Sequence, residues 1–500
     1  MGGWAGQNIS FLLIKHGKPY LTCSRQEMAP MRNLAVDEQA QWKSQFESFS
    51  SDWLEKVEGY MQMDSLGDIS KALFENRFDI LGQAAHALIE KRFGHLLDQQ
   101  YCECPHCHKQ VKAKPEKVKR EVIIMACPIV LYRPYFYCKA CRYGFYPLDE
   151  ALGLCHRKIQ PDVQEVEAWL AANGPYDEAA ETFKRCTGMD ISNHHIHDVT
   201  NEMAKDLSIL DICPGKDEVH RQVELLAKDK FRRPILMIGI DGAHAPTRRE
   251  PSQRKGPRGK GEWKEVKGFR MYLIDNKRIV HLISWHQIKS DKELSADLLY
   301  IKEAGLIPED RVRICVIGDG APWIWNRIQE SYPNARKVLD YYHCSEYLHD
   351  LANAQYGKNS QKAREWVEAT LTRLFHNRPD QIIAGIKRMK PTSDSAKEQI
   401  TKTVRYLSER KEMIHYGSLK RGGYHIGSGG IESSNKFISN VRLKRSGAWW
   451  YPTNANNILK LRCAIYNGTF DRIMADSRAQ NNLNKSHDKT PNLRLIVDNS

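Results

Sequence analysis

Two short apolar runs, each closely followed by an Asp-Gly pair, constrain the fold of this chain more than any other feature. Residues 235–240 and 312–317 are mostly aliphatic and long enough for one strand each. Such runs are typical of central strands that are buried on both faces of a sheet covered by helices. Asp241 follows the first run and Asp319 follows the second. The pattern therefore predicts an α/β fold with a carboxylate at the tip of each of two buried strands.

The order of the remaining elements indicates how these two strands are arranged. Further strands are expected near residues 269–274, 279–285 and 338–340, and helices over 291–304 and after Pro322. Three antiparallel strands followed by helix, strand, helix and strand is the order of an RNase H-like core. In that fold the first and fourth strands are neighbours, so we expect Asp241 and Asp319 to meet in space.

Two carboxylates at close range repel each other unless a divalent cation lies between them. Hard oxygen ligands suit Mg²⁺, and we choose Glu432 as the third ligand because the glycine-rich segment 426–431 lets a helix start close to the site. The sequence thus predicts that Asp241, Asp319 and Glu432 hold two Mg²⁺ (or Mn²⁺) ions. The alternative is that the two Asp-Gly pairs are ordinary turns and Glu432 an ordinary residue at a helix start. Two similar strands that both end at an aspartate make this alternative less favoured. Downstream, Arg442 and Lys444 offer phosphate contacts.

Two C-x-x-C pairs predict a second metal site. Cys104 with Cys107, and Cys138 with Cys141, each place two thiolates on a tight turn. Four sulfurs complete a tetrahedron and leave no open position, which is typical of structural Zn²⁺. The run at 122–131 between the pairs suits the hairpin of a zinc ribbon. Three nearby residues could each replace one of the four ligands: Cys102, His106 and His108.

Residues 176–207 read as helix, turn, helix. Gly188 can end the first helix and Ser192 can cap the second. Four polar residues of the second helix are expected to face solvent: Asn193, His194, His197 and Asn201. In a DNA-binding helix-turn-helix such residues face the major groove. Any pair of antiparallel helices looks similar, so a solvated polar surface, or a histidine metal site, remains an alternative.

The charge balance favours a nucleic-acid partner. The chain has 75 Lys and Arg against 61 Asp and Glu, a net charge of +14, which favours polyanions, with nucleic acid ahead of an anionic membrane. A glycine-containing, net-positive loop follows the first strand, and its expected phosphate contacts are Arg254, Lys255, Arg258 and Lys260. No apolar run reaches the roughly 18 residues of a membrane span, and the segment 11–14 is too short for a signal peptide. We therefore expect a cytoplasmic, nucleoid-associated protein without a membrane partner.

The N-terminal region is expected to be helical, because apolar residues recur every three or four positions from Trp42 onward and again at Leu81 and Leu88. We favour the buried face of a small bundle over a dimerisation element. The expected domains are a helical region at 1–99, a zinc ribbon at 100–150, a helix-turn-helix domain at 155–212, the first part of the core at 231–345, a helical insertion at 346–424, the final part of the core at 425–475 and a polar tail at 476–500.

Together these motifs resemble a known family. Ile240-Asp241-Gly242, Gly318-Asp319-Gly320, Asp340-x-x-His343 and Gly427-Ser428-Gly429-Gly430-Ile431-Glu432 are similar to the motifs of bacterial insertion-sequence DDE transposases of the Kra type, and more distantly to Mutator-like transposases. Asp340-x-x-His343 matches their (C/D)-x-x-H motif, and the helical stretch 346–420 matches the insertion that precedes their final glutamate.

The resemblance implies an activity and partners. It implies that Asp241, Asp319 and Glu432 form the catalytic triad, and that the protein acts on double-stranded DNA, both the element ends and the target, as a homo-oligomer. The expected reaction is Mg²⁺-dependent 3′-end cleavage followed by strand transfer. His343 would orient the scissile phosphate or assist proton transfer, or else merely bond to Asp340. Two alternatives remain: a transposase-derived zinc-ribbon regulator without catalysis, and an RNase H-like nuclease that cuts without joining.

Overall fold

The computed structural model describes residues 44, 47–55, 58, 63, 65–228, 230–249, 261–275 and 278–487, with only the backbone described for 479–487. The four basic residues Arg254, Lys255, Arg258 and Lys260 lie outside this part, as do Trp42 and the segment 11–14. The chain divides into two compact units, Met1–Gly94 and His95–Ser500.

The described part of the first unit is helical, as the apolar spacing predicts. Its long helix α2 (Leu66–Leu97) begins in this unit and ends just beyond its boundary. The prediction of a buried bundle face is wrong for the described residues, because Leu81 is 37% exposed and Leu88 is 58% exposed. Of this helix, Ala72 and Ala87 are the buried residues.

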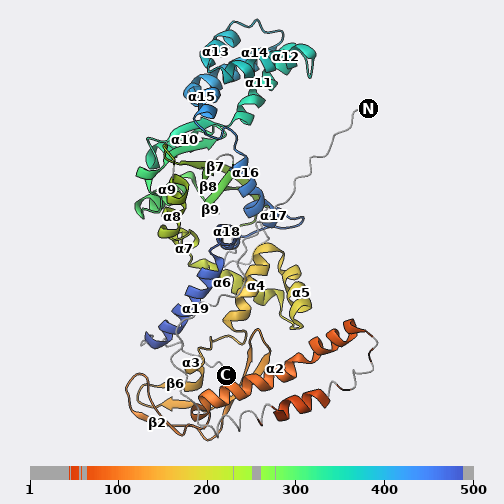
Figure 1. Cartoon of the computed structure of the whole chain (residues 1–500), viewed down its shortest axis with the longest axis vertical. Helices are drawn as coiled ribbons and strands as arrows, with labels where there is room; N and C mark the ends of the chain where they lie inside the picture. Colours follow the sequence, from red (N-terminus) through yellow and green to blue (C-terminus); the bar gives the residue numbers. More distant parts are fainter. Residues whose placement is uncertain are drawn as a thin grey trace. The chain divides into compact units, whose positions relative to one another are not determined.

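A five-stranded mixed sheet forms the centre of the second unit (Figure 1). Its strand order is β11-β10-β7-β8-β9, in which β7, β8 and β9 are antiparallel neighbours and β10 runs parallel to both β7 and β11. The strands are β7 (Ile235–Thr247), β8 (Glu262–Asp275), β9 (Arg278–Ile288), β10 (Arg313–Gly318) and β11 (Arg336–Leu339). The first and fourth strands of the sheet are therefore neighbours, with Ile317 opposite Gly239.

Both faces of β7 are buried, and this explains its unbroken apolar sequence. Successive side chains of a strand point to opposite faces. Leu236, Ile238 and Ile240 belong to one apolar core, shared with helices that include α9 (Asp291–Glu303), α10 (Pro322–Ser331) and α18 (Pro452–Asn467). Ile235 and Met237 belong to another core, shared with the helical insertion.

The insertion between β11 and the last part of the chain is helical throughout its length apart from short turns. Its five helices gather at one end of the unit (Figure 1). They are α11 (Tyr341–Tyr356), α12 (Gln361–Phe375), α13 (Pro379–Lys387), α14 (Asp394–Glu409) and α15 (Tyr416–Arg421), with the 3₁₀ turn η2 (Lys411–Met413) between the last two.

The segment before the sheet starts with three small hairpins and continues as helices. The hairpins pair β1 (Tyr101–Glu103) with β2 (Gln110–Lys112), β3 (Val118–Ile123) with β4 (Pro128–Arg133), and β5 (Phe136–Cys138) with β6 (Tyr143–Phe145). The helices are α3 (Pro147–Ala151), α4 (Pro161–Asn173), α5 (Tyr176–Thr187), α6 (Asn193–Lys205), α7 (Ile209–Ile212) and α8 (Lys216–Ala227). Residues of α4 and α6 share one apolar core with the sheet and α18, so these helices are not an independent domain.

The remaining elements follow the insertion. They are α16 (Gly429–Ser434), the π-helical turn η3 (Asn435–Asn440), α17 (Val441–Leu443) and α19 (Phe470–His487); the 3₁₀ turn η1 (Glu309–Arg311) precedes β10. The segment from 476, expected to be a polar tail, is therefore helical as far as His487. None of the described helices is long and apolar enough to cross a membrane.

Candidate functional site

The four cysteines of the C-x-x-C pairs converge on one point. Their sulfur atoms all lie within 4.8 Å of one another, with 3.9 Å between the Sγ atoms of Cys104 and Cys141 and 3.6 Å between those of Cys107 and Cys138. The residue after each pair adopts a left-handed backbone conformation, with φ of 57° at His108 and 51° at Arg142. Two turns of the same shape therefore present four sulfurs, a donor set that fits a structural Zn²⁺ ion.

The neighbouring residues that might have replaced a ligand do not belong to this cluster. His106 packs edge-on against the ring of Tyr143, with 4.3 Å between ring centroids, and the Cys102 thiol lies 3.5 Å from its neighbouring carbonyl of Glu103. A metal ion held by four sulfurs would have no open position, which is typical of structural Zn²⁺ sites.

A second cluster brings together four residues that the sequence singles out. Asp319 directly follows β10, as predicted, but Asp241 does not end its strand, because β7 continues to Thr247 by pairing with β8. His343 lies in the first turn of α11 and Glu432 in the first turn of α16. Burial, followed by the negative charges of Asp319 and Glu432, raises the pKa of Asp241 to about 6, against the opposing effects of the Gly242 amide and His343. These four groups are therefore close enough to interact electrostatically.

The helix α16 reaches the sheet because glycines allow close contact. A Cβ atom at Gly239 would lie 2.9 Å from the Cβ of Ile431, so a side chain on β7 would push α16 away. On the neighbouring strand, buried Arg270 donates a 2.7 Å hydrogen bond to the carbonyl of Gly430. Glu432 is exposed, and its carboxylate accepts a hydrogen bond from the hydroxyl of buried Ser428.

The turn after α16 contacts the first aspartate. Asn435 is buried at the start of the π-helical turn η3, and its Nδ2 donates a 2.7 Å hydrogen bond to Oδ2 of Asp241. The other oxygen of Asp241 accepts from the amide of Gly242 at 2.8 Å. Single π-helical turns within helices often occur at functional sites. Sequence reasoning missed Asn435, although its place three residues after Glu432 puts both on neighbouring positions of one helix face.

Asp340 connects His343 to the glycine-rich segment. Its buried carboxylate accepts hydrogen bonds from the His343 ring at 2.8 Å and from the Ser428 amide at 2.7 Å. The hydrogen bond to Asp340 raises the pKa of His343 to about 9 against the effect of burial, and the charge of Asp319 contributes to the same shift. The imidazole is therefore positively charged at neutral pH. The hydrogen bond to Asp340, one of the roles expected for His343, is present in the structure.

The acidic cluster is more open than the cysteine cluster. Among the described residues, the four cysteines are the one group of three or more His, Cys, Asp or Glu side chains whose ligand atoms all lie within 4.8 Å of one another. The carboxylates of Asp241, Asp319 and Glu432 do not form such a group in this structure.

The proposed recognition helix, α6, is only partly free. Gly188 ends α5 with φ of 65° and the Ser192 side chain caps α6, as predicted. His194 is exposed, but Asn193 donates a hydrogen bond to Asp177. His197 and Asn201 accept hydrogen bonds of 3.0 and 3.1 Å from α18, donated by Asn454 and Asn457. The expectation that all four residues face solvent is therefore corrected for the residues that contact α18.

The two basic residues downstream of Glu432 differ from each other. Arg442 is 3% exposed, packs between the rings of Tyr176 and Trp450, and donates a 2.8 Å hydrogen bond to the carbonyl of Ala171. Burial lowers its pKa to about 10. The expected phosphate contact at Arg442 is thus wrong, because a buried guanidinium cannot reach DNA, whereas Lys444 is exposed.

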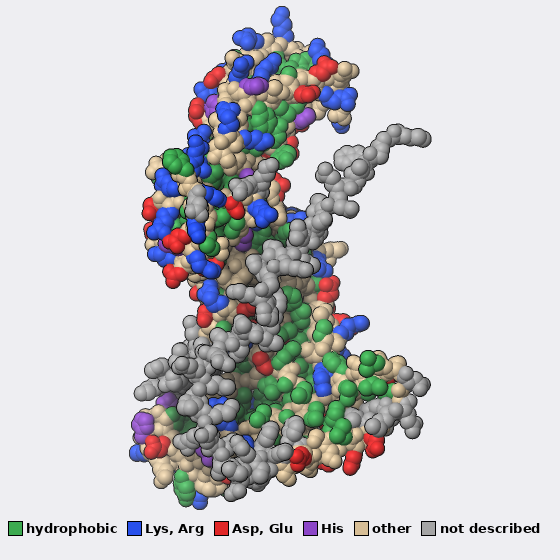
Figure 2. Space-filling view, in the orientation of Figure 1, with side chains coloured by type: hydrophobic (Ala, Val, Ile, Leu, Met, Phe, Trp, Pro, Cys, Tyr) green, Lys and Arg blue, Asp and Glu red, His purple; other side chains and the backbone are tan. Residues whose placement is uncertain are grey.

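Basic side chains are frequent on the visible face of the insertion helices and the adjoining sheet, with acidic side chains among them (Figure 2). The fold and the two clusters together define a mixed α/β protein with a four-cysteine cluster that could hold a metal ion and a separate acidic cluster beside its sheet.

Comparison with known proteins gives the family. The chain belongs to UPF0236, an uncharacterised protein family whose defining pattern matches residues 73–478. The "UPF0236 protein in vanSb 3'region" of Streptococcus gallolyticus is 24% identical over 339 residues, which cover 66% of this chain and 68% of that protein. The solved structure of a Drosophila P element transposase strand transfer complex covers 65% of this chain and 82% of its own, at 10% identity and a TM-score of 0.24. A similarity this low adds no weight to a functional argument.

Proposed function

We propose that this protein is a DDE-type transposase that binds the ends of an insertion sequence and catalyses Mg²⁺-dependent 3′-end cleavage and strand transfer. The observation that carries the proposal is the convergence of Asp241, Asp319 and Glu432, three acids distant in sequence, on one end of two neighbouring parallel strands. The strand order β11-β10-β7-β8-β9 is also the order of an RNase H-like core. A DNA-binding protein without catalysis has no use for converging carboxylates that repel phosphate.

The acidic residues would hold the metal ions. Asp241, Asp319 and Glu432 would bind two Mg²⁺ ions, which when bound would activate the attacking oxygen and stabilise the leaving 3′-oxygen. Burial first, and the negative charges of Asp319 and Glu432 after it, raise the pKa of Asp241, and a bound cation would offset both effects. The four cysteines would hold a structural Zn²⁺ ion away from the reaction.

The protein's own groups would orient the reactants. Asn435 fixes one oxygen of Asp241, and Ser428 fixes Glu432. The hydrogen bond to Asp340 holds the His343 ring, which would orient the scissile phosphate. In cleavage, water oxygen bonds to phosphorus as the P–O3′ bond breaks. In transfer, the freed 3′-hydroxyl attacks a target phosphodiester, whose own 3′-oxygen leaves, and the nucleophile's proton passes to solvent.

DNA binding would rely on exposed cations. Under this proposal Lys444, His194 and the four basic residues of the loop after β7 contact phosphate or base edges, and the protein acts on the nucleoid as a homo-oligomer that holds two element ends. Asn193, His197 and Asn201 could contribute only after giving up the intramolecular bonds described above.

The test uses a plasmid that carries the coding sequence with its native flanking DNA, incubated with Mg²⁺ and purified protein. Wild type is compared with Asp319→Asn and with Asp310→Asn, which makes the same change at an exposed residue nearby. We expect wild type and Asp310→Asn to give nicked ends and joined products, and Asp319→Asn to bind DNA without cutting it.

Each other outcome overturns part of the proposal. Binding without cleavage by the wild type would indicate a DNA-binding regulator. Cleavage without joined product would indicate a nuclease. Full activity of Asp319→Asn would show that this carboxylate is not a metal ligand.

A further inference from the structure

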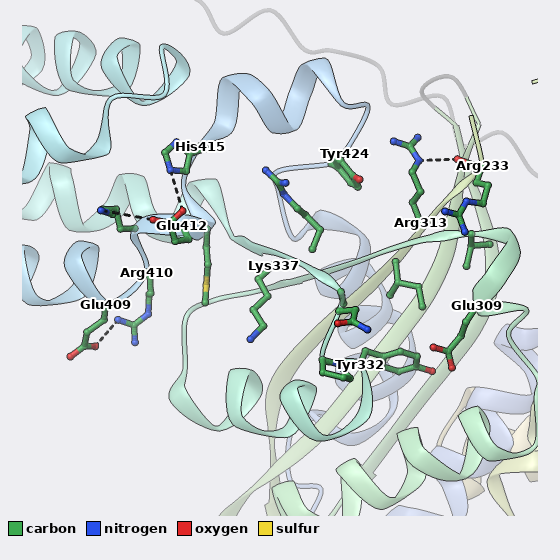
Figure 3. Close-up of a pocket in the computed structure, with 18 of the residues that line it drawn as sticks. Arg233, Glu309, Arg313, Tyr332, Lys337, Glu409, Arg410, Glu412, His415 and Tyr424 are labelled. Carbon is green, nitrogen blue, oxygen red and sulfur yellow. Dashed lines mark hydrogen bonds and ion pairs between the residues drawn. The ribbon is translucent and has the colours of Figure 1, made fainter. Parts of the chain in front are cut away.

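A large cavity lies away from the acidic cluster, along the outer edge of the sheet. Its volume is about 1040 Å³, and its walls come from the starts of β10 and β11, the end of α14 and the turn η2 (Figure 3). Arg313 begins β10 and Asp319 follows its end, so at about 3.3 Å per residue this part of the cavity lies roughly 20 Å from the acidic residue. The cavity is therefore distinct from the proposed catalytic centre.

The charge of the walls selects for an anion. Seven Lys or Arg residues and three Glu residues line the cavity. Arg233, Arg313 and Lys337 line it from three separate segments of the chain (Figure 3). Each donates a hydrogen bond to an uncharged acceptor within the protein and keeps its positive charge. Pockets for small organic ligands are lined mainly by apolar groups with a few polar ones. A lining of this composition suits a phosphate-bearing ligand instead.

Two lining groups have unused bonding capacity. Tyr332 is 2% exposed, and its hydroxyl has no hydrogen-bond partner among the described residues. A buried polar group without a partner costs roughly 1–3 kcal/mol, so such groups generally have a partner. Arg336 is exposed at the start of the edge strand β11, and its side chain makes no hydrogen bond or ion pair with any residue that the structure describes. The Arg336 side chain is therefore open to a bound phosphate, and the Tyr332 hydroxyl in the wall has capacity for one further hydrogen bond.

An aromatic side chain lies among the basic residues of the cavity, which favours a nucleic-acid strand. The half-buried ring of Tyr424 lines the cavity, with the guanidinium of Arg313 5.5 Å from the ring centroid. A basic groove with an aromatic side chain is typical of single-strand binding.

We propose that this cavity binds the phosphodiester backbone of a DNA strand. The inference rests on the proposed function only in taking DNA as the polyanion. It adds a contact surface whose lining residues lie outside the sequence motifs.

One wall residue links the cavity to the acidic cluster. Buried Arg410, which lines the cavity, donates hydrogen bonds of 3.0 and 2.7 Å to the carbonyl of Gly320, and Tyr406 donates one of 2.9 Å to the carbonyl of Asp319. Gly320 has φ of 94°, so this turn depends on a residue without a side chain. A strand in the cavity would contact the residue that supports the loop carrying Asp319.

The test measures the affinity of the full-length protein for a fluorescein-labelled single-stranded 20-mer by anisotropy, without added Mg²⁺ and at several salt concentrations. Arg336→Ala is compared with Arg388→Ala, the same substitution at an exposed arginine of the insertion outside the cavity. Loss of one phosphate contact should weaken binding about fivefold at 0.1 M salt and reduce the salt slope by about 0.7. Arg388→Ala should bind as wild type does.

A second variant tests the buried hydroxyl. Tyr332→Phe should weaken binding while leaving the melting temperature of the free protein unchanged or higher, because the hydroxyl has no partner to lose. Equal affinities of wild type, Arg336→Ala and Tyr332→Phe would overturn the proposal, as would complete displacement of the 20-mer by ATP at millimolar concentration, which would indicate a nucleotide pocket.

This readout is independent of cleavage. If the wild type fails to cut the plasmid but the cavity variants lose affinity, the binding site stands and the transposase proposal falls. If the wild type cuts and joins DNA while the cavity variants bind normally, the transposase proposal stands and the proposed binding site falls.

Discussion

A buried histidine beneath α16 provides a quantitative test of the packing around the acidic cluster. His286 on β9 has no exposed surface, and its Nε2 lies 2.8 Å from the Ser434 hydroxyl. It faces Gly268 on β8, where a Cβ atom would lie 2.2 Å from its ring. Burial lowers the pKa of His286 to about 3, with the charge of Arg270 acting in the same direction and a bond to Asn435 against it.

The sign and size of the effect follow from this lowered pKa. In the unfolded chain the ring has an ordinary pKa of about 6.5, so below that pH the unfolded state binds one more proton than the folded state. The stability contributed by the neutral ring is complete above pH 6.5 and is lost as the pH falls towards 3. At pH 5 the protonated form of the ring outnumbers the neutral form about thirtyfold in the unfolded chain. The free energy of unfolding is therefore about 2 kcal/mol lower at pH 5 than at pH 7.

The assay is urea unfolding of wild type and His286→Gln at pH 7 and pH 5. The variant should lose about 2 kcal/mol less stability than wild type between the two pH values, because glutamine does not titrate. His194→Gln, at an exposed histidine of α6, should lose as much as wild type does. Equal pH dependence of wild type and His286→Gln would refute the reasoning, and so would an NMR titration of the His286 ring in the wild type with a pKa above 6.

Three further predictions concern the cysteine cluster and the basic residues. Cys138→Ser should lower the bound zinc by about one equivalent per chain, measured by metal analysis, and lower the melting temperature, since binding to such a site contributes to folding; zinc content equal to wild type would contradict the four-sulfur site. Arg442→Ala should destabilise the protein by about 2 kcal/mol in urea unfolding, because it leaves a buried carbonyl unpaired and removes ring contacts. Arg442→Ala should leave the salt dependence of duplex DNA binding unchanged, whereas Lys444→Ala should reduce its slope by about 0.9; the opposite ranking would refute their assignment.

The sequence is sufficient for features that local pattern determines. The alternating contacts of Leu236, Ile238 and Ile240 follow from an unbroken apolar run, and the cysteine turns follow from their spacing. The pairing of β7 with β10 could be predicted from the sequence, because the order of the elements restricts the possible topologies.

The remaining features depend on segments that are distant in the chain. His197 and Asn201 were expected in solvent because nothing near them indicates that α18, about 250 residues later, covers them. Arg442 was assigned to the surface from its charge, but aromatic rings and a helix-end carbonyl stabilise it inside. The cavity beside β11 is formed by several segments, each of which looks like ordinary charged surface by itself.

The insertion leaves and rejoins the sheet at the same place. The amide of Tyr341, at its first residue, donates a 2.8 Å hydrogen bond to the carbonyl of Ile426, where the chain returns. Helices of any number can be accommodated between two ends that are already joined in this way, without moving Asp241 or Asp319. Relatives should therefore vary in length within this insertion while keeping α14, because Arg410 that follows it bonds to the Gly320 turn. Such variation would change the outer surface of the protein and leave the geometry around Asp241 and Asp319 unchanged.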